Sequence, residues 1–282
     1  MVALEQRFPR PSVMGVVNVT PDSFSDGGAF LDADSAIAQG RRLAAEGADL
    51  LDIGGESTRP RAQPVTADEE IARVLPVIAA LANDETAVMI SIDTSKLAVA
   101  EAALGAGARY VNDVTAFRTE PDLAGLVADR GVDCCLMHML GEPRTMQDDP
   151  RYDDVVSDVK AFLEERLAFA VAEGIDEARV ALDPGIGFGK TVEHNLQLVQ
   201  RLDEIVAIGR PVVIGTSRKS FLGRITGRDV TERGPATLAT CVLAYLNGAR
   251  VFRVHEVAST RDALLVTAAT VTGQWSSTTT AR

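Results

Sequence analysis

Polar side chains follow eight short apolar stretches of the sequence, one group after each stretch. In chain order they are Asn18, Glu56, Asp93, Asn112 with Asp113, His138, Asp183, Ser217 to Lys219, and Arg253 with His255. An unpaired charge at the end of a buried stretch is costly, so these groups must meet one another, water or a ligand. The acceptors Asp93, Asn112 and Asp183 follow earlier stretches, and the cations Lys219 and Arg253 follow the last two. The set predicts a ligand with hydrogen-bond donors at one end and negative charge at the other.

Each of these residues also has a simpler structural explanation. A single carboxylate such as Glu56 or Asp113 is more often a helix cap or one half of a local ion pair. The recurrence of polar residues after all eight stretches favours a shared site. A zinc centre is not expected, because His138 and His255 have no third histidine or cysteine pair nearby, and His194 falls in a helical stretch.

A glycine-rich stretch at residues 183–191, DPGIGFGKT, is similar to two nucleotide-binding motifs but matches neither. In the P-loop register that ends on Gly189 and Lys190, the leading glycine of the motif falls on Pro184. In the dinucleotide register that starts at Gly185, the third glycine falls on Lys190. Something other than a nucleotide-binding motif must explain this stretch.

The apolar stretches themselves have the length and composition of buried strands. They begin at Ser12, Ala48, Ala87, Arg109, Asp133, Arg179, Pro211 and Arg250, and each is followed by a turn and a helix-like segment. Continuous apolar strands that alternate with helices predict a parallel sheet covered on both faces. Eight such repeats favour an α/β fold of the single (β/α)8 TIM-barrel type, with a doubly wound open sheet as the alternative. Polar residues after every strand favour the barrel, because all of its strand ends converge on one mouth.

The composition is that of an ordinary globular protein, with 46% hydrophobic and 24% charged residues. The 28 basic and 40 acidic residues give a net charge of −12, which disfavours binding to nucleic acid or to an anionic membrane. Cys134, Cys135 and Cys241 are expected as buried thiols rather than disulfides. No apolar run resembles a secretory signal or approaches the length of a membrane span, so we expect a cytoplasmic protein.

The chain is expected to contain one folded domain with short extensions at its ends. We assign residues 1–11 to an N-terminal extension, residues 12–275 to the barrel and residues 276–282 to a frayed tail. The segments after the first two strands, VTPDSFSDGGAF and GGESTRPRAQPV, have the proline, glycine and polar residues of mobile active-site loops. An ordinary surface turn is the alternative for the first of them.

Eight ordered motifs of this chain are similar to those of the dihydropteroate synthase family: MGVVNVTPDSFSDGG, DIGGESTRP, SIDTSK, VNDVT, LMHMLGEPRTMQ, LDPGIGFGKT, IGTSRKSFLG and RVHEV. The resemblance extends from about Ser12 to the final helix-like segment. It implies a pterin-binding (β/α)8 barrel that joins 6-hydroxymethyl-7,8-dihydropterin diphosphate to 4-aminobenzoate with the help of Mg²⁺. The products that it implies are diphosphate and 7,8-dihydropteroate, an intermediate of folate biosynthesis.

The resemblance assigns roles to individual residues of this chain. It places the pterin against Asp93, Asn112, Met137, Asp183, Gly187, Phe188 and Lys219. It places the diphosphate against Asn18, Thr58, Arg253 and His255, with Asn18 as the protein ligand of Mg²⁺. It places 4-aminobenzoate against Thr58, Pro60, Phe188, Lys219 and Ser220. The catalytic and loop residues that it implies are Asp26, Thr58, Arg59, Lys219, Arg253 and His255.

The same resemblance gives a chemical reason for the glycine-rich stretch. Asp183 can accept two adjacent N–H donors from the aminopyrimidinone edge of a pterin, at about 1.5 to 3 kcal/mol for each charged hydrogen bond. The glycines let the backbone and Phe188 approach a flat ring. Lys190 is then expected on the surface at the start of a helix rather than as a phosphate ligand.

Three features depart from the usual pattern of the family. Arg61 stands where glycine is usual, Glu256 stands where aspartate is commoner, and VTAFR at residues 114–118 replaces a glycine-containing turn. Arg61 and Glu256 leave open a non-catalytic pterin-binding relative. A pterin-dependent methyltransferase barrel is also open, although it would have no use for the cations at Arg253 and His255.

The family resemblance also implies a homodimer through its late helices. The segment at residues 235–249, PATLATCVLAYLNGA, offers a surface of small and apolar side chains. The same surface would equally allow packing against the barrel, so the sequence leaves both arrangements open.

Overall fold

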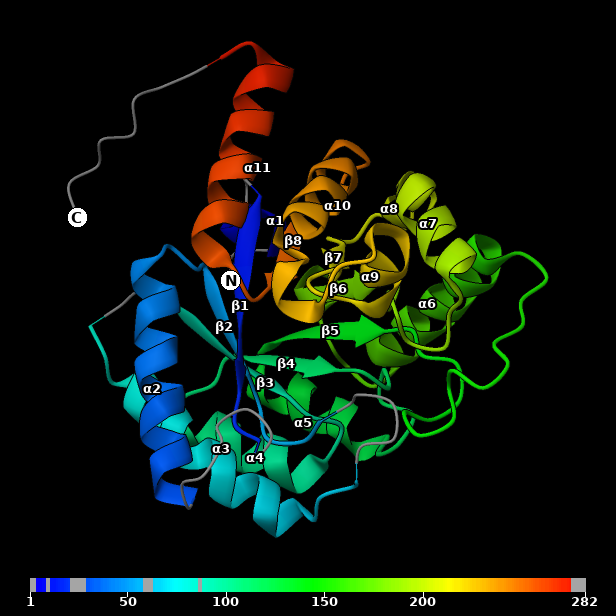
Figure 1. Ribbon diagram of the computed structural model, residues 1–282. Helices are drawn as coiled ribbons and strands as arrows, with labels where there is room; N and C mark the ends of the chain where they lie inside the picture. The colour runs from blue at the N-terminus through cyan, green and yellow to red at the C-terminus, as the bar shows by residue number, and fades with distance from the viewer. Residues whose placement is uncertain (1–3, 9–10, 21–28, 58–62, 86–87, 275–282) are drawn as a thin grey trace.

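Eight parallel strands stand at the centre of the computed structural model, which describes residues 4–8, 11–20, 29–57, 63–85 and 88–274 (Figure 1). The strands are β1 (Ser12–Asn18), β2 (Leu50–Gly54), β3 (Met89–Asp93), β4 (Tyr110–Asp113), β5 (Asp133–Met137), β6 (Val180–Asp183), β7 (Val213–Ile214) and β8 (Val251–Val254). They lie side by side in the order β6, β5, β4, β3, β2, β1, β8 and β7. An isolated bridge from Leu182 to Val212 connects β6 to the residue before β7. The strands form a nearly closed (β/α)8 barrel, which confirms the predicted fold and excludes the open sheet.

Helices precede and follow the strands along the chain, and those after β1 surround the barrel (Figure 1). They are α1 (Leu4–Arg7), α2 (Ala29–Ala45), α3 (Ala67–Ala82), α4 (Leu97–Ala106), α5 (Asp122–Arg130), α6 (Val155–Ala172), α7 (Val192–Gln200), α8 (Leu202–Val206), α9 (Ser220–Thr226), α10 (Gly234–Leu246) and α11 (Val257–Thr272), with short 3₁₀ turns η2 (Glu177–Arg179) and η3 (Val230–Glu232). Reciprocal capping boxes start α3, through Thr66 and Glu69, and α7, through Thr191 and His194. His194 therefore has a structural role as part of the N-terminal cap of α7. None of the helices in the described ranges is long and apolar enough to cross a membrane.

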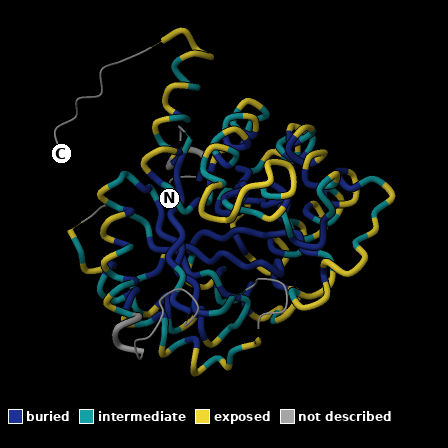
Figure 2. Tube along the Cα trace, viewed as in Figure 1, coloured by how far each residue is buried: buried dark blue, intermediate teal, exposed yellow. Residues whose placement is uncertain are grey.

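Buried apolar residues of the described chain form two core regions and a small cluster of Val114, Met137, Met139, Met146 and Phe188, and Figure 2 colours the buried parts of the backbone dark blue. The larger region lies between the strands and the helices and includes Cys134 and Cys241. The smaller region consists of Leu4, Phe8, Met14, Leu50, Tyr110, Cys135, Ala181, Val213 and Val251. Several of these residues begin their strands, so α1 closes the N-terminal end of the barrel. The three cysteines are buried and free, as predicted.

Strand β7 is shorter than the apolar stretch that predicted it. The stretch begins at Pro211, but only Val213 and Ile214 have strand geometry. Pro211 has no N–H group to donate to a neighbouring strand, although its carbonyl oxygen accepts a hydrogen bond from Leu182 N at 2.9 Å. After Ile214 the chain turns, and Lys219 N donates to Thr216 O at 3.2 Å. This turn carries Lys219 over the C-terminal end of the barrel.

Candidate active site

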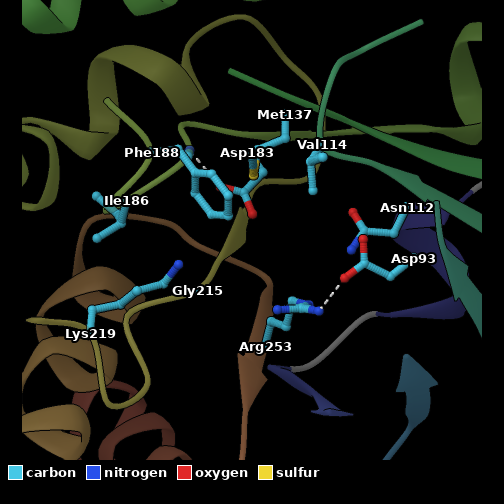
Figure 3. Close-up of a pocket in the computed structure, with 11 residues that line it drawn as sticks. Asp93, Asn112, Val114, Met137, Asp183, Ile186, Phe188, Gly215, Lys219 and Arg253 are labelled. Atoms are coloured by element: carbon cyan, nitrogen blue, oxygen red, sulfur yellow. Dashed lines mark hydrogen bonds and ion pairs between the residues drawn. The ribbon is translucent and has the colours of Figure 1, made fainter. Parts of the chain in front are cut away.

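Strand register brings the predicted acceptors together at the C-terminal ends of the strands. Asp93 is the register partner of Asn112 across β3 and β4, and Met137 is the partner of Asp183 across β5 and β6. A pocket opens there, lined by Asp93, Asn112, Val114, Met137, Asp183, Gly185, Ile186, Phe188, Gly215, Lys219 and Arg253. Figure 3 shows Asp93 and Asn112 on one side of it, Asp183 with Phe188 on another, and Lys219 and Arg253 completing the ring. Acceptors and cations therefore share one pocket.

Arg253 lies between two carboxylates of the barrel. Its Nε donates to Asp52 Oδ2 at 2.6 Å, and its Nη2 donates to Asp93 Oδ2 at 2.6 Å (Figure 3). Burial opposes the charge on Arg253, but the two carboxylates outweigh it, so the pKa of Arg253 is raised. Burial raises the pKa of Asp93 to about 7 despite the attraction of Arg253. Arg253 is therefore a permanent cation in a fixed position at the pocket.

Asp52, which was not predicted from the sequence, connects the two sides of the pocket. It is fully buried in β2, and its Oδ1 accepts a hydrogen bond from Ser91 Oγ at 2.6 Å. Its Oδ2 accepts from Asn112 Nδ2 at 3.0 Å in addition to Arg253. Because the amide nitrogen of Asn112 binds Asp52, its Oδ1 is the atom oriented to accept from a ligand. The signal in the sequence was an acidic residue inside an apolar strand, which requires buried partners.

Asp183 is held in place by the backbone turn that follows β6. Its Oδ1 accepts a hydrogen bond from Gly185 N at 2.7 Å, and the residue is 6% exposed. Burial raises the pKa of Asp183, and this backbone bond together with Lys219 and Arg253 acts in the opposite direction. Gly185 has φ of +68°, and a Cβ there would lie 1.8 Å from His138 O. The turn that fixes Asp183 therefore requires glycine at this position.

Lys219 and Phe188 form the rim of the pocket next to Asp183. Lys219 Nζ lies 4.2 Å from the centroid of the Phe188 ring, a cation–π arrangement. A Cβ on Gly187 would lie 3.1 Å from Lys219 Cδ, so the backbone of Gly187 runs against the lysine stem. Burial, with a further contribution from Arg253, lowers the pKa of Lys219 to about 8. Six of the seven residues predicted to hold a pterin thus line one pocket, and the seventh, Gly187, lies beside it against Lys219.

Comparison with known proteins identifies the family. The profile of the family described as "Pterin binding enzyme" matches residues 14–255 of this chain. The dihydropteroate synthase of Haemophilus influenzae is 44% identical over 260 residues, which cover 92% of this chain and 94% of that protein. The chain belongs to the dihydropteroate synthase family of pterin-binding enzymes.

Two solved structures of the dihydropteroate synthase of Xanthomonas albilineans are similar to this chain. The one with 4-aminobenzoic acid has a TM-score of 0.88 and 49% sequence identity, and the match covers 94% of each chain. The one in complex with 7,8-dihydropteroate has a TM-score of 0.85 and 47% identity over 94% of this chain and 95% of that chain. The similarity to dihydropteroate synthases therefore includes the whole barrel.

Besides Gly187, three residues that the dihydropteroate synthase resemblance assigned to the site are not part of the pocket lining. His255 follows β8, and its Nδ1 lies 2.9 Å from Ser217 Oγ, which also accepts from the backbone N of His255 at 3.2 Å. These two contacts orient the His255 ring after β8. Asn18 is half-buried at the end of β1, and Ser220 is exposed at the start of α9.

Two carboxylates at the strand ends do not line the pocket and have structural roles. Glu56 Oε2 accepts from Lys96 Nζ at 2.7 Å. Asp113 accepts from Thr115 N at 2.8 Å and from Phe117 N at 2.7 Å. Glu56 therefore forms an ion pair, although with a residue 40 positions away, and Asp113 stabilises a turn. The count of polar strand ends overstated the number of residues at the site.

Two departures from the family pattern are explained by these contacts. Ala116 and Phe117 have φ of +52° and +61°, the left-handed region that favours glycine, and Asp113 supports this turn through its hydrogen bonds. Glu256 Oε1 accepts from Arg218 Nη2 at 2.6 Å and from Arg218 Nε at 3.0 Å. Glu256 therefore holds the residue that precedes Lys219.

The prediction that Lys190 lies on the surface is wrong. Lys190 is 3% exposed, and its Nζ lies 2.9 Å from His138 Nδ1 and 3.0 Å from Phe188 O. The segment after β5 covers this helix start, and the Tyr152 ring centroid lies 6.0 Å from Lys190 Nζ. The sequence motif around Lys190 could not show that the segment after β5 folds over this lysine.

Four residues assigned to the dihydropteroate synthase site lie outside the described residues: Asp26, Thr58, Arg59 and Pro60. The departure at Arg61 lies outside them as well. Their roles, and the mobility of the loops that contain them, stay predictions.

Proposed function

We propose that this protein is a dihydropteroate synthase that condenses 6-hydroxymethyl-7,8-dihydropterin diphosphate with 4-aminobenzoate. The observation that carries this proposal is the convergence of Asp93, Asn112 and Asp183 with the cation Arg253 in one pocket. The Xanthomonas albilineans structures with 4-aminobenzoic acid and with 7,8-dihydropteroate support it. A methyltransferase barrel would share the acceptors but would not need the cation.

The acceptor side of the pocket fits the pterin ring. Asp183 is fixed by Gly185 N, so its carboxylate can accept adjacent N–H groups from the pterin edge without reorganising. Asn112 Oδ1 and Asp93 provide further acceptors on the facing side, and Met137 and Phe188 provide apolar contact. This side of the pocket orients the pterin.

The cation side of the pocket fits the leaving group. The C–O bond between the pterin methylene carbon and the diphosphate breaks, and both electrons leave with the diphosphate oxygen. Arg253 stabilises the charge that develops there, and we assign His255 to the oxygens of the same diphosphate. The carbon then accepts the lone pair of the 4-aminobenzoate nitrogen, and the proton of the new C–N centre passes to solvent.

The rim of the pocket fits 4-aminobenzoate. Phe188 offers an aromatic face, and the ammonium group of Lys219 lies above it, where it can attract a carboxylate. We assign Ser220 to the outer part of this region, together with Thr58 and Pro60. Asp26 and Arg59 complete the proposal as residues of the loops that exclude water. An aromatic amine is already nucleophilic, so no strong side-chain base is required.

Magnesium is proposed as the cofactor, with Asn18 as its protein ligand. No cluster of three or more His, Cys, Asp or Glu side chains suited to a metal occurs among the described residues. A neutral amide oxygen fits Mg²⁺, which keeps several waters and binds substrate phosphates rather than an all-protein cage. Bound there, Mg²⁺ would supply positive charge to the diphosphate.

The test is a diphosphate-release assay with the purified protein. With both substrates and Mg²⁺ we expect release that depends on 4-aminobenzoate, and with excess EDTA we expect release to fall to background and to return when Mg²⁺ is restored. If a positive-control enzyme is active in this assay and the purified protein releases no diphosphate, the synthase proposal is refuted. Binding of methyl-tetrahydrofolate in that case would favour the methyltransferase.

We also propose that the protein forms a homodimer through α10 and α11, and that it works in the cytoplasm. Large apolar side chains are exposed on both helices, including Leu243 at 52% and Leu246 at 54% on α10 and Val266 at 66% on α11. The two helices are neighbours at one side of the barrel (Figure 1). Large exposed apolar side chains on two neighbouring helices favour an interface.

Sedimentation equilibrium at micromolar concentration is expected to give a dimer mass for the wild type and a monomer mass for Leu246→Asp. Val171→Asp, which changes an exposed apolar residue on α6, is the matched control and should remain dimeric. A monomeric wild type would end the proposal.

A further inference from the structure

The turn that carries Phe188 is held by side chains from three places in the chain. Gly185, Gly187 and Gly189 all have positive φ, so the turn itself has little intrinsic rigidity. Yet three successive carbonyl oxygens in it each accept a hydrogen bond from a side chain. The pairs are Gln147 Nε2 to Gly187 O at 2.5 Å, Lys190 Nζ to Phe188 O at 3.0 Å, and Tyr152 Oη to Gly189 O at 2.8 Å.

The middle bond of this set comes from a lysine that no proposed step uses. Lys190 Nζ lies 2.9 Å from His138 Nδ1, and both residues are buried. Burial, and then the nearby cation Lys190, lowers the pKa of His138 to about 2, so His138 is neutral and its Nδ1 accepts from Lys190. Burial lowers the pKa of Lys190 to about 7. An amine this buried is retained only where its hydrogen bonds are needed.

The two sides of the pocket depend on this turn to different degrees. Asp183 ends β6 and is fixed by Gly185 N, ahead of the three bonded carbonyls. The Phe188 ring is attached at the middle carbonyl and lies 4.2 Å from Lys219 Nζ. Loss of the Lys190 bond would therefore loosen the backbone at Phe188 and leave the acceptor for the pterin edge in place.

We propose that Lys190, held by His138, is a positioning residue that fixes the Phe188 ring for capture of 4-aminobenzoate. This inference rests on the proposed synthase function. Lys190 touches no substrate in this proposal, and its effect on 4-aminobenzoate passes through Phe188. His138 sets the direction of the lysine, because its Nδ1 is the second acceptor of the same ammonium group.

The first experiment compares Lys190→Met with Lys160→Met, a lysine on α6 away from the pocket. Lys190→Met keeps the stem and removes the donors. We expect the KM for 4-aminobenzoate to rise about 10-fold, which is the loss of about one hydrogen bond, while the Kd for the pterin diphosphate changes less than about 2-fold. Lys160→Met should change neither value. Equal losses for both substrates, or no change in KM, would overturn the proposal.

A double-mutant cycle tests whether Lys190 acts through the ring. In a Phe188→Leu background, Lys190→Met should add less than about a 2-fold change in the KM for 4-aminobenzoate, because the group that it positions is gone. A full additional 10-fold rise would show a role independent of Phe188. If Lys190→Met does not fold, His138→Asn is used, since its amide oxygen retains an acceptor near the Nδ1 position, and a smaller rise than with His138→Ala is expected.

A readout without turnover separates this inference from the proposed function. The ring carbon signal of Phe188, identified by its absence in Phe188→Leu, is recorded by NMR without substrates. It should shift and broaden in Lys190→Met and stay in place in Lys160→Met. If the wild type releases no diphosphate, the synthase proposal fails, and an unchanged Phe188 signal in Lys190→Met would refute the positioning role by itself.

Discussion

Arg253→Met is expected to lower kcat/KM for diphosphate release by about 1,000-fold. Removal of one preorganised group that stabilises a developing negative charge typically has an effect of about this size. Arg253 is held at the pocket by Asp52 and Asp93 at 2.6 Å each. Methionine retains much of the apolar stem but no charge, so the departing diphosphate loses its fixed cation. Initial rates of diphosphate release over a range of pterin diphosphate concentrations give the value.

Arg253→Lys is the matched control for this prediction. Lysine keeps the positive charge but cannot donate from two fixed nitrogens to two carboxylates, so we expect a loss of roughly 10- to 100-fold. Arg253→Met also leaves Asp52 and Asp93 without their cation, and breaking such a buried pair costs about 3 to 5 kcal/mol of unfolding free energy. Urea unfolding of each variant separates this effect from catalysis. A folded Met variant with near wild-type kcat/KM would contradict the assigned role.

Asp183→Ala is expected to weaken binding of the pterin diphosphate by about 100- to 10,000-fold. Two charged hydrogen bonds at about 1.5 to 3 kcal/mol each are lost, and each 1.4 kcal/mol corresponds to about 10-fold in Kd. The carboxylate is buried at the end of β6 and aimed into the pocket beside Phe188 (Figure 3). Isothermal titration of each protein with the pterin substrate, without 4-aminobenzoate, measures the change.

Asp129→Ala, an exposed carboxylate on α5, is the control for charge alone and should bind as the wild type does. Asp183→Asn should bind more weakly than the wild type, because an amide offers one acceptor and presents a donor to the donors of the ring. If Asp183→Ala bound the pterin with unchanged affinity, the ring would have to lie elsewhere in the pocket.

The fold could be predicted from the sequence because its signals are local. Eight apolar stretches alternated with helical segments, and each stretch except the seventh became a strand of four or more residues. At the seventh, Pro211 removed a donor and shortened the strand to Val213 and Ile214. The positions of Asp93, Asn112, Asp183, Lys219 and Arg253 followed from the rule that barrel strands end at one mouth.

The rest of the site depends on contacts between residues far apart in the chain. Asp52 lies in the middle of a strand, and its importance comes from Arg253, 201 positions away. Lys190 is buried because the segment after β5 folds over it, and its partner His138 is 52 positions away. Conversely, Glu56 and Asp113 had the right place in the sequence, but Glu56 binds Lys96, 40 positions away, and Asp113 binds the backbone of the turn that follows it. The position of a residue along its strand predicted whether it could reach the mouth of the barrel. It did not predict whether its side chain already binds another group of the protein.

The single bridge between β6 and the residue before β7 has a consequence for how substrate and scaffold affect each other. Asp183 ends one side of this break in the ring of strands, and the turn after the other side carries Lys219. A heterocycle that contacts both Asp183 and Lys219 would connect β6 to the turn after β7. It would therefore stabilise the barrel at the point where only an isolated bridge joins the neighbouring strands. Because a ligand that binds only the folded protein stabilises it, tighter binding of the substrate should raise the melting temperature of the barrel.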